Sequence, residues 1–369
     1  MKLMKTTEAV GQVLCHDITQ IIPGVKKDAV FRKGHIITKE DIPVLLSVGK
    51  DTIYIWENDE TMMHENEAAE VLYRMSACGT NSIEADAKRH CDDTDSGVFG
   101  GTVSKMHPSP VKEGKIEVIA DCDGLLKVDS EKLKKVNSFG ELMIATRHGN
   151  TTVKKGDKLA GTRIIPLVIK KDKLSAASHI CDDGPILDIK PFVIRKAAII
   201  TTGNEVYHGR IQDAFTPVIE KKIAEFGAQM MFHEVFDDDD KKITDGCLRA
   251  IEAGAEIVFC TGGMSVDPDD KTPLAIKNTG ARIVSYGSPV LPGAMFLLSY
   301  YDAGDRLVPI CGLPGCAMYN KRTIFDIVLP RLMARDMILA DELAGLGEGG
   351  LCLNCDVCTF PNCGFGKGF

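Results

Sequence analysis

The chain has 369 residues, of which 44% are apolar and 26% are charged, a composition typical of a globular protein with two or three domains. The formal net charge of −8 argues against general binding to a nucleic-acid backbone. The sequence contains no run of about 18 apolar residues, so we expect no membrane span. The N-terminus lacks the apolar core of a secretory signal. We therefore expect a cytoplasmic protein that binds neither nucleic acid nor membrane.

The first half of the chain predicts small modules. Residues 1–112 combine short strand-like runs with a helical pattern from residue 59 to about 88, and they end in a loop rich in Gly, Ser, Asp and Pro. Residues 113–194 return to β-like runs such as "KIEVIAD" and "ELMIATR". We therefore expect an N-terminal α+β region over residues 1–112 and a β-rich module over residues 113–194.

Residues 195–340 predict an α/β domain. The apolar runs "KAAIITTG", "AQMMFHEVF" and "EIVFCTGG" predict strands, and helical segments alternate with them. Two helices are expected to begin at Thr-Pro pairs, with Thr216 as the cap of the first, and a last helix is expected over residues 316–335. Such alternation predicts a largely parallel sheet, and these sheets bind ligands at the carboxyl ends of their strands.

Glycines follow the predicted strands in three loops. Glycine lets the main chain turn tightly and lets an anion approach its N–H groups. The segment "GLPG" at 312–315 is also expected to open a helix, whose dipole favours an anion. Glycines that only shape turns are the alternative, but three such loops in one sheet favour a phosphorylated ligand. The glycines concerned are Gly203, Gly262, Gly263 and Gly315.

Acidic side chains stand close to the second glycine loop. Asp269 and Asp270 are adjacent, and two carboxylates so close together favour a cation or a hydrogen-bond donor nearby. A carboxylate at this place could hold Mg²⁺ beside a phosphate. It could equally accept hydrogen bonds from a ring that carries adjacent N–H groups.

Residues 196–335 resemble a known domain. Their segments "TTGNEV", "GRIQDAF", "EIVFCTGGMSVDPDD", "PVLPGAMF" and "ICGLPGCAMY" are similar in order and spacing to the molybdopterin-binding domain of the MogA and MoeA families and of gephyrin. The resemblance implies a MogA-like three-layer α/β/α domain with a mostly parallel sheet. Residues 1 to about 190 resemble the MoeA side more loosely, and the usual C-terminal β-domain of MoeA has no counterpart in this sequence.

The resemblance also implies the site residues. Asp213 and Asp270 would be catalytic, and Asp213 or the run at 237–240 could hold Mg²⁺ for a phosphoanhydride step. The ligand-binding residues would lie in three loops: Thr202, Gly203, Asn204 and Glu205; Gly262, Gly263, Ser265 and Asp270; and Pro314 and Gly315.

The function implied by the resemblance is the last step of molybdenum cofactor assembly. Adenylated molybdopterin binds, molybdate is inserted, and AMP leaves. MoeA proteins carry a Lys-Pro-Gly-Lys-Pro turn whose two lysines suit an oxyanion such as molybdate. In this sequence Leu291 and Ala294 replace both lysines. A non-catalytic protein that carries or senses the cofactor is therefore the alternative to a molybdopterin molybdenumtransferase. The relatives imply a homodimer, and a molybdoenzyme is a candidate partner.

The last segment, residues 341–369, is a glycine-rich linker followed by a cysteine-rich tail. Four thiolates so close in sequence suit Zn²⁺ or an iron–sulfur cluster. The first three have the spacing that begins a bacterial ferredoxin motif, whereas the fourth is one residue late. We expect a metal-binding tail, with a slight preference for the cluster, held by Cys352, Cys355, Cys358 and Cys363.

Overall fold

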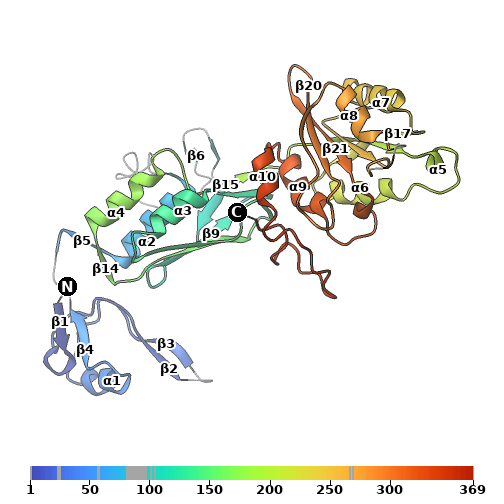
Figure 1. The fold of residues 1–369 in the computed structure, drawn as a ribbon. Helices are drawn as coiled ribbons and strands as arrows, with labels where there is room; N and C mark the ends of the chain where they lie inside the picture. The colour runs from blue at the N-terminus through green and yellow to red at the C-terminus, as the bar shows by residue number, and fades with distance from the viewer. Residues whose placement is uncertain are drawn as a thin grey trace. The chain divides into compact units, whose positions relative to one another are not determined.

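The computed structural model describes residues 2–22, 26–55, 59–79, 98, 99, 102, 103, 105–265, 267 and 270–368 (Figure 1). The chain forms two compact units, each with its own core. The first contains Met1–Asp121, Val128–Arg147 and Lys155–Asp188, and the second contains Cys122–Lys127, His148–Lys154 and Ile189–Phe369. None of the described helices is both long and apolar enough to cross a membrane.

The first unit begins with a small α+β module. Strand β1 pairs antiparallel with β4, and β2 pairs antiparallel with β3. Buried side chains including Leu14, Leu45 and Ile53 form its core. Its elements are β1 (Lys2–Lys5), η1 (Thr6–Glu8), β2 (Ile18–Ile22), β3 (Lys26–Phe31), α1 (Asp41–Ser47) and β4 (Thr52–Ile55).

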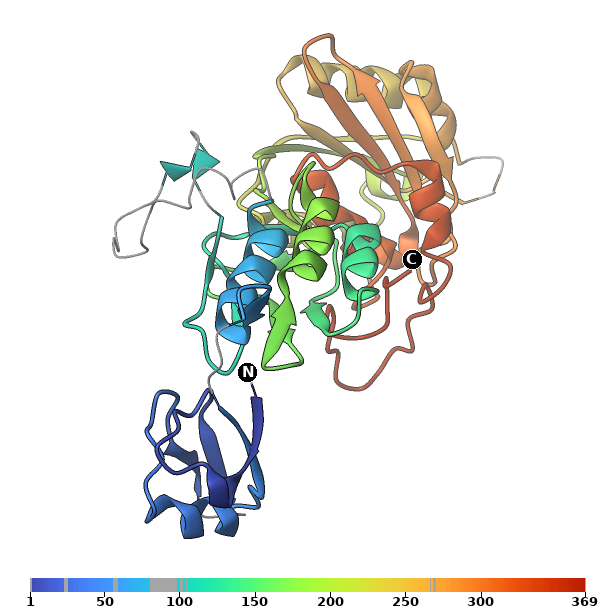
Figure 2. The same cartoon turned by 90° about the vertical axis from the view of Figure 1, so that its left-hand side faces the viewer.

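The rest of the first unit is a sheet covered by helices. Its four strands have the order β11-β13-β9-β8, and helices α2, α3 and α4 lie side by side on one face (Figure 2). The sheet strands are β8 (Met106–Pro108), β9 (Lys115–Ala120), β11 (Leu142–Thr146) and β13 (Lys158–Ile164). The helices are α2 (Glu65–Ala77), α3 (Ser130–Asn137) and α4 (Lys171–Ser178), the last followed by η3 (His179–Cys181).

Shorter pairings complete this half of the chain. Strands β5 (Met62–His64) and β14 (Val168–Lys170) pair, as do β6 (Val98–Phe99) and β7 (Thr102–Val103). A further three-stranded sheet has the order β12 (Thr151–Val153), β10 (Gly124–Val128), β15 (Leu187–Lys190). Helix α2 lies within the predicted helical segment, whose residues 80–88 fall outside the described residues. Helices α3 and α4 were not indicated by the β-like runs around them.

The second unit contains the predicted α/β domain. Its six-stranded sheet has the order β17-β16-β18-β21-β20-β19, in which the first four strands are parallel to one another. The last two strands are antiparallel additions at one side. The strands are β16 (Lys196–Thr202), β17 (Gln229–Phe236), β18 (Ile257–Thr261), β19 (Arg282–Tyr286), β20 (Leu297–Asp302) and β21 (Leu307–Leu313).

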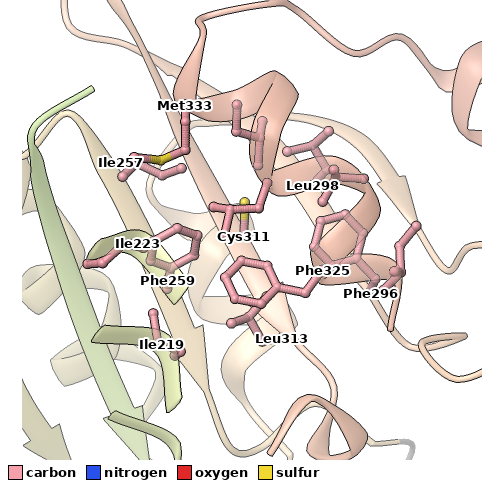
Figure 3. Packing of buried hydrophobic residues seen from close by; sticks show 14 of the residues in the cluster. Ile219, Ile223, Ile257, Phe259, Phe296, Leu298, Cys311, Leu313, Phe325 and Met333 are labelled. Carbon is pink, nitrogen blue, oxygen red and sulfur yellow. The ribbon is translucent and has the colours of Figure 1, made fainter. Parts of the chain in front are cut away.

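Helices cover both faces of this sheet, so the predicted three-layer α/β/α fold is confirmed. On one face α6 and α9 pack against a core that includes Phe259, Phe325 and Cys311 (Figure 3). The rings of Phe259 and Phe325 meet edge to face with centroids 5.3 Å apart. On the other face, α7 and α8 pack against a second core. The helices are α5 (Asn204–Tyr207), α6 (Phe215–Ala224), α7 (Asp240–Glu252), α8 (Thr272–Asn278) and α9 (Ile324–Met333).

Three predictions about these elements were wrong. Helix α6 begins at Phe215 with Ala214 as its N-cap, because the Asp213 carboxylate accepts hydrogen bonds from the first amides. The segment "GLPG" does not open the last helix: Gly312 lies within β21, and the short 3₁₀ helix η4 (Gly315–Ala317) follows. Helix α9 begins at Ile324, where the Thr323 side chain and Asp326 form a capping box.

The glycine-rich segment before the tail is not an extended linker. Helix α10 (Ala340–Gly345) occupies its first part, and Leu346 packs against the core of the α/β domain. The tail is held by main-chain hydrogen bonds, from Leu291 N–H to Gly350 O and from Cys352 N–H to Leu291 O, both 2.8 Å long. The side chain of Phe365 is buried in the same core. Packing therefore orders the tail.

Candidate functional site

The three glycine loops leave the sheet at the same edge. Strands β16, β18 and β21 are adjacent and parallel, and Thr261 is paired with both Thr201 and Leu313. The loops that start at Gly203, at Gly262 and just after Leu313 therefore begin side by side. This is the carboxyl edge at which parallel sheets bind ligands.

Close packing explains the two glycines after β18. Their φ angles are +81° at Gly262 and +54° at Gly263, in the region that favours glycine. A Cβ atom on Gly262 would overlap the carbonyl oxygen of Thr202, and one on Gly263 would lie 2.8 Å from Thr272 Oγ1. The Thr272 hydroxyl in turn donates to Gly262 O at 2.9 Å. The loop is therefore fixed against both β16 and α8.

The main-chain amides of these loops differ in availability. Among the residues that the structure describes, none accepts a hydrogen bond from the amides of Gly262, Gly263 or Gly315. In contrast, the Gly203 amide donates to Phe236 O at 3.2 Å, and the Asn204 amide donates to the Asp238 carboxylate at 3.2 Å. The amides of the second and third loops are therefore able to donate hydrogen bonds to an anion. The amides of the first loop already donate to other protein groups.

The clearest sign of a missing partner is at Asp270. Its Oδ2 atom is buried, yet no described residue donates a hydrogen bond to it. A buried polar oxygen that lacks a hydrogen-bond donor costs about 1–3 kcal/mol. A ligand that carries N–H donors would remove this cost. The Asp270 carboxylate is therefore suited to accept hydrogen bonds from the N–H groups of a pterin ring. Asp269, its predicted neighbour, lies outside the described residues.

Tyr286 is a neighbour of this carboxylate that the sequence did not single out. Burial, and secondarily the negative charge of Asp270, raise the pKa of Tyr286. Its hydroxyl donates to Met264 O at 3.3 Å, between the glycine loop and β19. No motif marks a tyrosine on an edge strand, and only the fold brings it to this place. Ser265, in the same loop, is exposed.

Asp213 has a different environment from Asp270. One carboxylate oxygen accepts from the amides of Phe215 and Thr216, at 2.8 and 3.1 Å. The other accepts from the hydroxyls of Thr201 and Thr216, at 2.9 and 2.5 Å. Burial alone would raise the pKa of Asp213, but these hydrogen bonds outweigh it and hold the pKa below its ordinary value. Asp213 thus joins the start of α6 to the end of β16.

The acidic run after β17 is also engaged in structure. Asp237 pairs with Lys242 at 2.7 Å, and Asp239 caps α7 by accepting from the Lys241 and Lys242 amides. Asp240 accepts from Asn278 Nδ2 at 3.1 Å. No group of three or more Cys, His, Asp or Glu side chains within the described ranges is placed to hold a metal ion. The structure therefore offers no preformed Mg²⁺ site at these residues.

The same holds for the four tail cysteines. Cys352 and Cys363 pack against the core of the α/β domain, whereas Cys355 and Cys358 are exposed. A tetrahedral zinc site or a cluster needs its thiolates around one point. The docked tail does not provide this arrangement, so it does not fit the predicted metal.

The fold and this edge define a class: a three-layer α/β domain with a glycine-loop ligand site. Residues 198–334 match the family model described as "Probable molybdopterin binding domain". This part of the chain therefore has the molybdopterin-binding type of domain, which confirms the predicted resemblance for the domain, whereas nothing here shows the MoeA type in particular. Residues 3–57 match a second family model, described as "Domain of unknown function (DUF8806)".

Individual proteins are similar to parts of the chain. A putative competence-damage inducible protein from Bacillus cereus is 32% identical to this chain over 129 residues, which cover 35% of this chain and 30% of that protein. The protein of the same name from Clostridium kluyveri is 26% identical over 156 residues, which cover 37% of each chain. The chain thus spans only about a third of their length. The tungsten cofactor synthesizing protein MoaB from Pyrococcus furiosus has a TM-score of 0.30 and 18% identity, covering 40% of this chain and 91% of that chain. CinA from Thermoplasma acidophilum has a TM-score of 0.28 and 19% identity, covering 34% and 92%.

Proposed function

We propose that the carboxyl edge of the α/β sheet binds molybdopterin. The observation that carries this proposal is the buried Oδ2 atom of Asp270, which has no donor among the described residues. A pterin ring presents adjacent N–H groups, from which a carboxylate can accept hydrogen bonds. The amides of Gly262, Gly263 and Gly315 would then receive the phosphate, and Thr202, Asn204, Glu205, Ser265 and Pro314 would shape the pocket around the ligand.

The proposal predicts a large effect at Asp270. Asp270→Asn keeps the size of the side chain but replaces one acceptor by a donor that faces the pterin N–H groups. We expect molybdopterin to bind at least about tenfold more weakly, as measured by anaerobic titration calorimetry. Asp305→Asn is the matched control, because the Asp305 side chain is exposed and pairs with its neighbour Arg306. Equal affinities of wild type and Asp270→Asn would contradict the assignment.

For the reaction, we propose insertion of molybdate into adenylated molybdopterin with release of AMP. Asp270 would orient the pterin, and Asp213 would act by positioning the loop between β16 and α6. Mg²⁺ would supply charge neutralisation at the phosphoanhydride, and it would have to bind together with the ligand. The test is release of AMP from adenylated molybdopterin with molybdate and Mg²⁺. Binding without release would instead favour a carrier or sensor, which the absence of lysines at Leu291 and Ala294 supports.

Assembly and location belong to the same proposal. We propose a cytoplasmic homodimer that passes its ligand to a molybdoenzyme. Light scattering of the purified protein measures whether it is a dimer. Co-purification with a molybdoenzyme tests whether the two proteins interact.

The tail yields a prediction about metal removal. No three of the described Cys, His, Asp or Glu side chains are placed to hold a metal ion, so zinc or an iron–sulfur cluster at the four cysteines would require the tail to rearrange. Since packing already orders the tail, we expect a chelator to change the free energy of unfolding by less than about 0.5 kcal/mol. Elemental analysis and an absorption spectrum accompany the unfolding curve. Stoichiometric zinc or iron, removed with loss of stability, would show that the tail binds metal in a different conformation.

A further inference from the structure

A cavity of about 340 Å³ lies in the second unit, apart from the strand-end loops. Its walls come from four segments: residues 150–154, residues 222–226 at the end of α6, residues 322–330 at and just before α9, and the tail from Phe360 to Lys367. None of the described residues assigned to the carboxyl edge lines it. Its volume is within the range of about 300–1,000 Å³ that is usual for small-molecule sites.

The floor of the cavity carries an excess of positive charge. The buried Asp326 carboxylate accepts hydrogen bonds from two lining cations, Lys222 and Arg322, the latter at 2.8 Å. Its other oxygen accepts from the Thr323 amide at 2.9 Å. One carboxylate therefore serves two cations, and Arg322 also lies beside the Cys358 thiol. The Lys222 side chain is only 13% exposed, so water screens its positive charge poorly.

The remaining ionisable groups do not reverse this sign. Lys154 and Lys367 also line the cavity, and Glu225 is the only other acidic residue among its described lining. Lys154 and Lys367 make other contacts of their own, so the pair of cations at Asp326 decides the charge of the site. A ligand that carries a negative charge would suit this pair.

The walls are aromatic and apolar. Phe226, Phe360 and Phe365 line the cavity together with Pro330 and Pro361. The Arg322 guanidinium stands over the Phe360 ring, 5.0 Å from its centroid. This stacking orients the planar group, which can then bind an oxyanion with two parallel hydrogen bonds. The body of the ligand would pack between the rings.

We propose that this cavity is a second ligand site, which binds a small organic anion made of a planar ring and a phosphate or carboxylate group. Lys222 and Arg322 hold the anionic group, and the phenyl rings of Phe226, just after α6, and of the tail hold the ring. The site does not depend on the pterin edge, since no residue is shared between them. A mononucleotide and a free pterin acid are two sources of this chemistry.

The test is titration calorimetry of the full-length protein with AMP, pterin-6-carboxylate, adenosine and inorganic phosphate. We expect AMP or pterin-6-carboxylate to bind at least about tenfold more tightly than adenosine or phosphate alone. Arg322→Gln and Phe360→Leu are each expected to weaken that binding tenfold or more. Arg249→Gln, which removes an exposed ion pair with Glu234 on the other face of the sheet, is the control. Unfolding curves of each variant show whether it has folded.

Each other outcome would overturn the inference. If neither ring anion binds more tightly than phosphate, the cavity is not a site of this class. If a ring anion binds but Arg322→Gln and Phe360→Leu leave its affinity unchanged, it binds elsewhere. If Asp270→Asn is the only variant that loses binding of the ring anion, the anion binds at the carboxyl edge. That result would overturn this inference and leave the proposed function intact.

Discussion

Gly262→Ala is expected to lower the free energy of unfolding by about 2–5 kcal/mol. Two costs add at this position. Alanine at a φ of +81° is strained, and its Cβ atom would overlap the Thr202 carbonyl oxygen and lie 2.9 Å from the Thr202 carbonyl carbon. Both of these are main-chain atoms of a central strand, so neither can move cheaply. Urea unfolding followed by circular dichroism measures the loss.

The same substitution should also weaken ligand binding. To relieve the overlap, the loop after β18 must move away from β16, and the amides of Gly262 and Gly263 move with it. Gly161→Ala, in β13 of the first unit, is the matched control, since no atom lies within 4 Å of its Cβ position and its φ is not in the left-handed region. We expect Gly161→Ala to leave ligand binding unchanged and to change stability by less than about 0.5 kcal/mol. Equal effects of the two substitutions would show that the packing around Gly262 is not rigid.

The central strands of this domain were predictable because burial on both faces leaves a plain signal. The runs that became β16 and β18 are almost continuously apolar, as expected for parallel strands between two helix layers. Strand β20 was not predicted, because its sequence "LLSYYD" mixes polar and apolar residues. The polar Ser299 is nevertheless fully buried there, and its hydroxyl donates to Ile310 O at 3.0 Å.

The tail and the site carboxylates show what sequence alone cannot give. Glycine-rich composition predicts flexibility, but the tail is ordered by distant contacts, such as those of Leu291 and of the core around Phe365. The family resemblance implies the same catalytic role for Asp213 and Asp270. Only the fold shows that the oxygens of Asp213 are already occupied, whereas one oxygen of Asp270 has no donor among the described residues.

A second large effect is expected at Asp336, outside both proposed sites. Its carboxylate accepts from Lys127 at 2.8 Å, from Lys190 at 2.6 Å and from Arg331 Nε at 2.6 Å. The Asp336 side chain is only 6% exposed. Asp336→Asn would remove the counter-charge of Lys127 and Lys190, while Arg331 would keep its pair with Glu342 at 2.7 Å. We therefore expect a loss of about 3–5 kcal/mol in the free energy of unfolding. Asp305→Asn, at an exposed pair, should cost less than about 1 kcal/mol.

The pH dependence provides an independent check on the same residue. Burial alone would raise the pKa of Asp336, but the lysine and arginine partners lower it to about 2. A carboxyl group whose pKa is lowered on folding stabilises the protein fully above its ordinary pKa near 3.8, and this contribution is lost as the pH falls towards 2. We expect wild type to lose about 2–3 kcal/mol through this group in that interval. Asp336→Asn should lack this part of the acid dependence, because it has no proton to gain. If the stability of the two proteins falls in parallel between pH 5 and pH 2, the charge of Asp336 does not stabilise the fold.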